Sequence, residues 1–315
     1  MKILIWNDIE GVSGIDDPET GFNDDKHMDL ITKEINSVIK GLKKTGAKQI
    51  EIFDGHGMGD NLNLEILDKK AKYLGGGWMV VLADLIRSGK FSEYDALILL
   101  GMHSQEGTVD GFIAHTNSML TALYLNNKPI GEIEQAAWLA GYFGVPTILV
   151  SGDYAAIKEA KYYLPEIETQ ATKKKEGEKF ICLPLEEIYK NLEDKANKKL
   201  KEINKIKPYT FEGPIEVKIL HAFEKAAEDM SIFPGYEKID NRTVIYHAKD
   251  FLEAFWAYHG FRPILQGLFS QPFYKLIDEM EEQLNLDFQK DIKPLLDKVT
   301  NEFFSTKIQF PEINF

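Results

Sequence analysis

Short apolar runs alternate with stretches of helical periodicity through the first 165 residues of the chain. Apolar runs that predict buried strands cover residues 2–6, 48–53, 94–100 and 147–150. Apolar residues spaced three or four positions apart predict helices over residues 25–44 and 131–144. This alternation predicts an α/β fold, a three-layer α/β/α arrangement around a mostly parallel sheet.

The pattern changes in the second half of the chain. Residues 186–205 predict a highly charged helix with a solvated face, and residues 208–214 predict a boundary. Strands at 215–220 and 243–247 predict a smaller α+β region, and amphipathic helices are expected at 275–286 and 292–304. We therefore expect a catalytic α/β domain at 1–207, an α+β region at 208–264 and a helical C-terminal extension at 265–315.

Composition excludes several classes of protein. The 315 residues carry a formal net charge of −13, which argues against non-specific nucleic-acid binding. Cys182 is the single cysteine, so an internal disulfide and a cysteine-based zinc site are both excluded. No apolar stretch approaches the roughly 18 to 20 residues of a membrane span. The N-terminus lacks the plan of a signal peptide, and we expect a soluble, cytoplasmic protein without a membrane partner.

Polar side chains follow four of the predicted strands. Asp8 and Glu10 follow the first, Asp54 and His56 the second, His103 the third and Asp153 the fourth. Because parallel strands end at one edge of a sheet, these side chains are expected to share a cleft. Glu132 at a helix start and His115 in a loop are candidates for the same place. Histidines with carboxylates suit zinc, with manganese or cobalt as substitutes.

Charge balance favours two divalent ions. Asp8, Glu10 and Glu132 supply three negative charges against four positive, and the remaining positive charge would lower the pKa of a bridging water. One carboxylate, most simply Asp8, can bridge the ions, and His115 is left as a proton shuttle. Asp54 and Asp153 have two open roles, either orienting ligand histidines or serving as turn and helix-capping residues. Taken singly, His56 and His103 are each more simply structural residues.

The motifs together resemble the zinc-dependent D-aminopeptidase family of DppA-like dinuclear metallopeptidases, over roughly residues 1–260. They are DIEGVSG at 8–14, DGH at 54–56, GMH at 101–103, His115 and PIGE at 129–132. The resemblance implies that Asp8 bridges two zinc ions, that Glu10 and His103 complete one site, and that His56 and Glu132 complete the other. His115 matches the family's catalytic histidine, as nucleophile or as acid/base.

The resemblance also implies an activity and an assembly. We expect an aminopeptidase that removes the N-terminal residue, D-amino acids among the candidates, from short peptides by means of a metal-bound hydroxide. Family members form ring-like homo-oligomers, such as a decamer. Two alternatives stay open: a dinuclear metal hydrolase of another amide or a phosphoester, and a non-catalytic, oligomeric peptide-binding protein.

Overall fold

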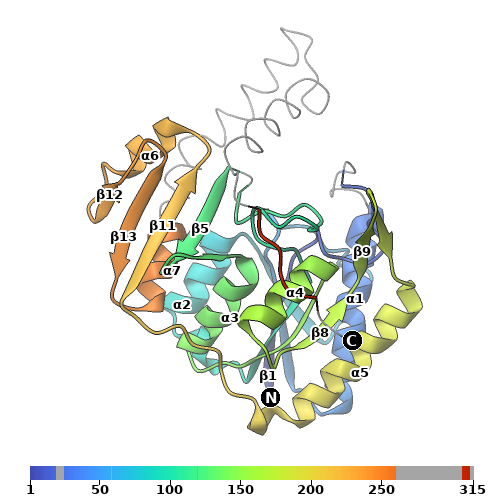
Figure 1. The fold of residues 1–315 in the computed structure, drawn as a ribbon. Helices are drawn as coiled ribbons and strands as arrows, with labels where there is room; N and C mark the ends of the chain where they lie inside the picture. Colours follow the sequence, from blue (N-terminus) through green and yellow to red (C-terminus); the bar gives the residue numbers. More distant parts are fainter. Residues whose placement is uncertain (19–24, 58, 119, 260–306, 313–315) are drawn as a thin grey trace, which may run out of the picture. The chain divides into compact units, whose positions relative to one another are not determined.

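The chain contains two compact units in the computed structural model, which describes residues 1–18, 25–57, 59–118, 120–259 and 307–312 (Figure 1). The first unit comprises Met1–His115, Gly131–Phe211 and Ile308–Phe315, and the second comprises Thr116–Ile130 and Glu212–Lys307. The division at Phe211 falls inside the segment 208–214. The helices expected at 275–286 and 292–304 lie outside the described residues, and the predicted domain boundaries stay predictions.

A six-stranded parallel sheet forms the centre of the first unit. Its strand order is β3-β2-β1-β4-β7-β8. The strands are β1 (Lys2–Asn7), β2 (Gln49–Asp54), β3 (Ala71–Gly76), β4 (Ala96–Met102), β7 (Thr147–Gly152) and β8 (Glu168–Ala171). Every residue of β4 and β7 is buried, as near-continuous apolar runs predict for strands covered on both faces. The predicted α/β class with a parallel sheet is confirmed.

The strand order reverses direction at β1. From β1 the chain adds β2 and then β3 on one side, and it returns to place β4 on the other side. The chain therefore leaves β1 towards α1 and leaves β4 towards α3, which lie on opposite faces of the sheet. This point of the sheet is where an α/β fold of this type holds its ligands.

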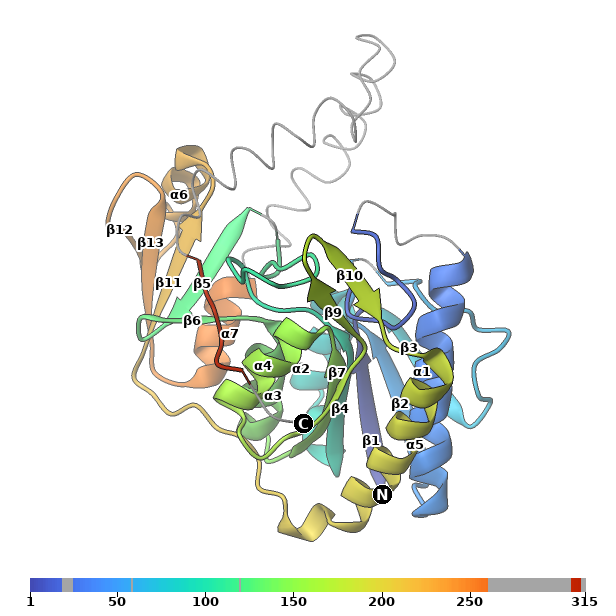
Figure 2. The ribbon, with the colours of Figure 1, turned by 45° about the vertical axis from the view of Figure 1, so that its right-hand side comes forward.

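Helices cover both faces of this sheet, as Figure 2 shows. On one face, α1 (Asp25–Lys44) packs along α5 (Leu185–Lys201), and the other face carries α3 (Glu132–Tyr142) and α4 (Tyr154–Tyr163). The charged helix α5 also has a buried stripe, formed by Ile188, Leu192, Ala196 and Leu200, and its solvated surface is the remainder. The unit also contains η1 (Trp78–Leu82), α2 (Ala83–Arg87), η2 (Lys90–Glu93), β9 (Lys173–Glu176), β10 (Lys179–Cys182) and η3 (Ile203–Lys205).

The second unit is built on a five-stranded antiparallel sheet of order β12-β13-β11-β5-β6. Its elements are β5 (Thr121–Leu125), β6 (Lys128–Ile130), β11 (Ile215–His221), α6 (Glu224–Met230), β12 (Tyr236–Lys238), β13 (Thr243–Ala248) and α7 (Phe251–His259). The β5–β6 hairpin comes from the first half of the sequence. The chain pattern did not predict that this hairpin joins the sheet formed by the later strands. Across the described residues, no helix has the length and apolarity needed to cross a membrane.

Candidate metal centre

Glycines bring the loops after β1 and β4 into direct contact. The Gly11 N–H donates to the Gly101 carbonyl over 2.8 Å, and a Cβ at Gly11 would lie 1.9 Å from the Met102 carbonyl oxygen. Gly101 itself has a φ of +69°, which favours glycine. Since no side chain fits between these backbones, Asp8 and Glu10 lie beside His103 at the point where the strand order reverses.

Asp8, Glu10 and His56 form a first group of potential metal ligands. His56 Nδ1 lies 3.1 Å from Asp8 Oδ1 and 3.1 Å from Glu10 Oε2. The backbone of His56 is fixed on both sides, because its N–H donates to Asp54 Oδ1 over 3.3 Å and its carbonyl accepts a 2.9 Å bond from Asn61 Nδ2. Asp54 therefore positions the ligand histidine through the main chain.

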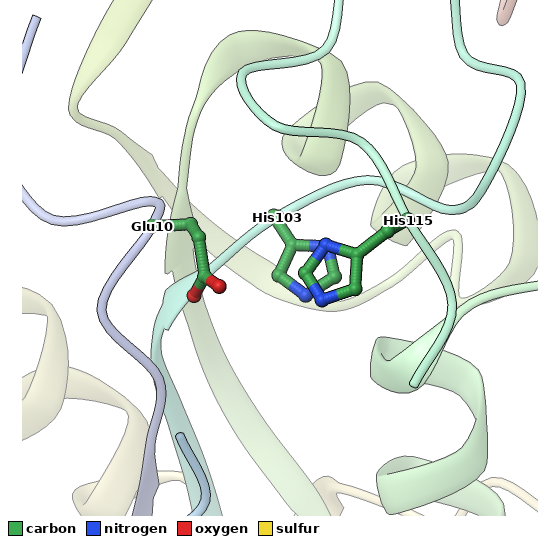
Figure 3. Close-up of side chains that lie close together, drawn as sticks. All are labelled: Glu10, His103 and His115. Carbon is green, nitrogen blue, oxygen red and sulfur yellow. The ribbon is translucent and has the colours of Figure 1, made fainter. Parts of the chain in front are cut away.

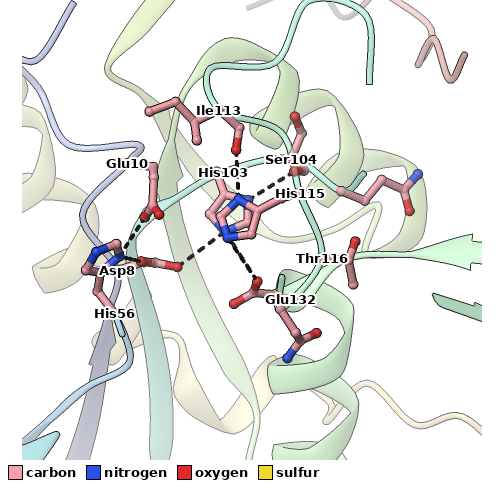
Figure 4. Close-up of polar contacts among 12 residues, drawn as sticks. Asp8, Glu10, His56, His103, Ser104, Ile113, His115, Thr116 and Glu132 are labelled. Carbon is pink, nitrogen blue, oxygen red and sulfur yellow. Dashed lines mark hydrogen bonds and ion pairs between the residues drawn. The ribbon is translucent and has the colours of Figure 1, made fainter. Parts of the chain in front are cut away.

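Asp8, His103 and Glu132 form a second group, which shares Asp8 with the first (Figure 4). His103 Nε2 lies 3.5 Å from Asp8 Oδ2 and 3.4 Å from Glu132 Oε1, and its side chain is fully buried. The His103 Nδ1–H donates to the Ser104 carbonyl over 3.0 Å, so in the neutral ring the Nε2 lone pair faces the carboxylates.

The spacing within both groups fits zinc. Ligand atoms about 2.0–2.2 Å from a tetrahedral zinc ion lie roughly 3.3–3.5 Å from one another. The two His103 distances, 3.5 Å and 3.4 Å, fall in this range, and the two His56 distances of 3.1 Å are slightly shorter. His103 Nε2 makes no hydrogen bond although it is buried. A nitrogen held between two carboxylates without a hydrogen bond is what a metal ligand requires.

Electrostatics point the same way. Burial and the neighbouring Glu10 carboxylate raise the pKa of Asp8 to about 8. Burial alone would lower the pKa of His56, but the carboxylates of Glu10 and Asp8 raise it to about 11. Glu132 likewise raises the pKa of His103 against the effect of burial. The cluster thus attracts positive charge strongly, and divalent cations satisfy it better than protons because they bind all its ligands at once.

His115 lies directly against this cluster, stacked on His103 (Figure 3). The ring centroids are 3.9 Å apart and the planes differ by 14°. The His115 Nδ1–H donates to the Ile113 carbonyl over 2.8 Å, and Nε2 lies 3.8 Å from Glu132 Oε1. Burial and the charge of His103 lower the pKa of His115, so its neutral form presents a basic Nε2 to the site.

The structure brings together the six residues that the sequence assigned to the metals and to acid/base chemistry. Glu10 was expected with His103, and His56 with Glu132. Glu10, His103 and His115 form a third group of potential ligands, while Glu10 also lies 3.1 Å from His56 and Glu132 lies 3.4 Å from His103. The expected pairing stays a prediction. Asp153 belongs to none of these groups. Its side chain caps α4 by accepting hydrogen bonds from the N–H groups of Ala155 and Ala156. The helix-capping alternative therefore applies to it.

Sequence reasoning missed a buried pair of carboxyl groups behind the second group. Glu134 Oε2 accepts the Gly131 N–H over 2.8 Å, Glu159 Oε2 accepts the Gln105 N–H over 2.7 Å, and each carboxyl group affects the pKa of the other. Burial raises the pKa of Glu134 to about 7 and that of Glu159 well above its usual range. One of them therefore keeps a proton, and the pair joins the segments that carry His103 and Glu132. The position of Glu134, three residues after the N-cap Gly131, was a usable signal for its bond to the Gly131 N–H.

A buried lysine behind the first group was also missed. Lys173 on β9 is fully buried, and its Nζ donates to the Glu10 carbonyl over 2.7 Å and lies 3.7 Å from the centre of the Phe112 ring. Next to it, Thr172 Oγ1 donates to the Gly11 carbonyl over 2.6 Å. These bonds fix the backbone of the loop that carries Asp8 and Glu10. A lysine in the run KKKE gives no sequence signal for burial.

Comparison with known proteins accounts for this geometry. A sequence profile described as D-aminopeptidase matches residues 1–259. The chain belongs to the D-aminopeptidase family. A D-aminopeptidase of Bacillus subtilis (strain 168) is 30% identical over 268 residues, which make up 82% of this chain and 95% of the relative. As a member of the D-aminopeptidase family, this chain is a metal-dependent aminopeptidase.

A solved structure supports the same relationship at the level of the fold. It is described as the Zn-dependent D-aminopeptidase DppA from Bacillus subtilis, a self-compartmentalizing protease. The match has a TM-score of 0.73 at 28% sequence identity, and it covers 82% of this chain and 95% of the solved one. The predicted membership of the D-aminopeptidase family is confirmed.

Proposed function

We propose that this aminopeptidase uses two zinc ions, held by Asp8, Glu10, His56, His103 and Glu132, to remove the N-terminal residue of short peptides, D-residues among them. The observation that carries the proposal is the set of three overlapping ligand groups in the described residues, two of which share Asp8. Three carboxylates and two neutral imidazoles leave one net positive charge on two divalent ions. Such a charge suits hydrolysis, because it favours ionisation of a water molecule.

The metals and the protein divide the work. When bound, two divalent ions polarise the peptide carbonyl and lower the pKa of a water molecule. Asp8 holds the two ligand groups in one fixed relation, since each of its oxygens faces a different histidine. Ser104, through its carbonyl, keeps the His103 lone pair directed into the site. The surrounding burial excludes bulk water and strengthens each of these interactions.

His115 moves protons in this proposal. Its Nδ1–H is committed to the Ile113 carbonyl, so Nε2 is the atom that faces the reacting groups. A depressed pKa keeps that nitrogen unprotonated near neutral pH, able to take a proton and later give it to the leaving amine. Covalent attack by the imidazole would demand a second chemical step, which water activated by zinc makes unnecessary. We therefore assign His115 as acid/base rather than nucleophile.

We also propose that the chain acts as a homo-oligomer. The matched DppA structure is a self-compartmentalizing protease, which describes an assembly that encloses its own sites. A ring, such as a decamer, in the cytoplasm stays the specific form of this proposal. Analytical ultracentrifugation of the purified chain tests it, and a monomer at micromolar concentration would contradict it.

The central test combines metal analysis with paired substrates. Purified protein is expected to contain two zinc ions per chain and to release the first residue of short D- or L-peptides, with activity lost on chelation and restored by zinc. Cleavage of other amides or of nitrophenyl phosphate, but not of peptides, would point to the alternative hydrolase. Zinc-loaded protein that binds peptides without cleaving them would support a peptide-binding protein.

Replacing the acid/base tests the mechanism separately. In His115→Gln we expect kcat to fall about 10²- to 10⁴-fold while two zinc ions stay bound, because proton transfer is lost and the ligands are intact. His247→Gln, on an exposed histidine of β13, is the matched control and should keep full activity. An unchanged kcat in His115→Gln would remove this residue from the mechanism.

A further inference from the structure

The last described segment of the chain, residues 307–312, pairs with a loop of the catalytic unit. Ile308 forms a parallel bridge with Thr108. The Ile308 N–H donates to the Gly107 carbonyl over 2.8 Å, and its carbonyl accepts the Val109 N–H over 3.0 Å. Residues 107–109 therefore gain a short extended partner from the far end of the sequence, drawn in red in Figure 1.

The same segment is anchored at its other end on α4. Phe310 is 6% exposed, with its ring centroid 5.7 Å from that of Tyr162 and 6.2 Å from that of Tyr163. The Glu312 carboxylate accepts a 3.0 Å bond from Lys158 Nζ and a 2.9 Å bond from the Tyr154 hydroxyl. Lys158 is itself buried, with a side chain only 3% exposed. An aromatic anchor and a half-buried ion pair thus hold the segment on a helix that packs on the central sheet.

The loop that this segment pairs with leads from one site residue to another. It begins after the ligand His103 and ends at His115, and its base is closed by a 3.1 Å bond from the His115 N–H to the Ser104 carbonyl. Within the loop, Thr108 Oγ1 donates to the Gln105 carbonyl over 2.8 Å. The contacts with Ile308 lie at the opposite end of the loop from its base, so they restrain the part that the base leaves least constrained.

We propose that residues 307–312 form a C-terminal strap that positions His115 by tying its loop to α4. The D-aminopeptidase profile ends at residue 259, so this strap lies outside the part of the chain that defines the family. Ile308 and Phe310 are positioning residues in this arrangement, because they act on His115 through the loop and touch neither metal ligands nor reacting atoms. The consequence for activity rests on the proposed role of His115, but the restraint on the loop does not.

Two single substitutions in the full chain test the strap. Ile308→Pro removes the N–H that binds the Gly107 carbonyl, and Phe310→Ala removes the anchor on α4. In each variant we expect kcat to fall about tenfold with KM and two bound metals unchanged, since His115 loses its fixed position. Hydrogen exchange of the amides in residues 105–112 should accelerate at least about tenfold. Gln309→Ala, at an exposed position between the two anchors, is the matched control. It should change neither kcat nor the hydrogen exchange of residues 105–112.

The outcomes separate the strap from the proposed function. Exchange rates in residues 105–112 that match those of the unmodified chain in both variants would overturn the strap. Faster exchange with an unchanged kcat would show that the strap does not position His115. A loss of bound metal large enough to explain the loss of kcat would lead to the same conclusion. If the unmodified chain cleaves no peptide while exchange accelerates in the variants, the aminopeptidase mechanism fails and the strap stands.

Discussion

The two ligand groups around Asp8 differ in how fully the protein encloses them. The first contains His56, whose side chain is 21% exposed, whose backbone is held by Asp54 and Asn61 and whose ring lies against Asp8 and Glu10. The second contains His103, which is fully buried, stacked on His115 and supported from behind by Glu134 and Glu159. The first group is therefore closer to solvent, and the second is more fully enclosed by protein.

Removing the residue that both groups share should have the largest effect. Asp8→Asn keeps the size of the side chain but replaces a bridging carboxylate by a neutral amide. We expect loss of both zinc ions and a decrease in kcat/KM of at least about 10³-fold, because several kcal/mol of transition-state stabilisation disappear. Metal analysis and steady-state kinetics measure both quantities.

A nearby isosteric change provides the control for this substitution. Asp60→Asn lies in the exposed turn after His56, at a φ of 68° that asparagine tolerates, and should retain metal and activity. Retention of two zinc ions by Asp8→Asn would mean that the two groups do not depend on a common ligand.

Separate removal of the two histidines tests the contrast between the groups directly. In His56→Ala we expect one ion to stay bound in the second group. The metal-free protein should lose less unfolding free energy than in His103→Ala, since water can reach the gap and solvate Asp8 and Glu10. In His103→Ala we expect the ion of that group to be lost. The metal-free protein should also lose about 3 kcal/mol of unfolding free energy, because Glu132 loses a buried partner.

Urea unfolding in the presence of a chelator, with metal analysis of the loaded proteins, compares these two variants. Equal losses of stability and equal metal contents would show that the two groups are held alike, and the contrast would be wrong.

The smallest expected effect concerns the carboxyl pair behind the second group. Burial raises the pKa of Glu134 to about 7 and of Glu159 well above its usual range, so the folded chain keeps protons that the unfolded chain releases above about pH 4.5. The contribution of this pair to the free energy of unfolding is therefore largest at low pH. It decreases as the pH rises towards 7, by about 1.4 kcal/mol per pH unit for each proton that the folded chain retains.

Glu159→Gln should reduce this dependence on pH, because the amide accepts the Gln105 N–H and donates to Glu134 without titrating. Urea unfolding between pH 4.5 and 7.5 gives the slope. Glu65→Gln, at an exposed position, should leave the slope unchanged. A slope in Glu159→Gln equal to that of the unmodified chain would show that the pair does not retain a proton in this range.

Sequence reasoning succeeded where a local pattern determines the structure. The first five residues of β4, at 96–100, are all apolar, and this run predicts a central strand that is covered on both faces. The structure agrees, because every residue of β4 is buried. The gathering of Asp8, His56 and His103 follows from the ends of parallel strands meeting at one edge. By contrast, β3 has the sequence AKYLGG and is only partly buried at the edge of the sheet, so it carries little periodicity to detect.

The separation of His56 from His103 agrees with the strand order, because β2 and β4 lie on opposite sides of β1. The pairing of the carboxylates stays a prediction, since Asp8 and Glu10 each lie close to both histidines. The approach of Glu132 to His103 depends on the packing of α3 against β4, which no local pattern reveals. The buried glutamates were missed for another reason. A glutamate in an amphipathic helix usually faces water, and only the tertiary contacts of Glu134 and Glu159 reveal the exception.

The crowded backbone at the end of β4 has a consequence for substitution of the glycines around it. A Cβ at Gly11 would lie 1.9 Å from the Met102 carbonyl oxygen, and a Cβ at Gly152 would lie 2.2 Å from the same atom. Alanine at either position is therefore expected to push these backbones apart and disturb the proposed metal centre, although all six site residues stay in the sequence.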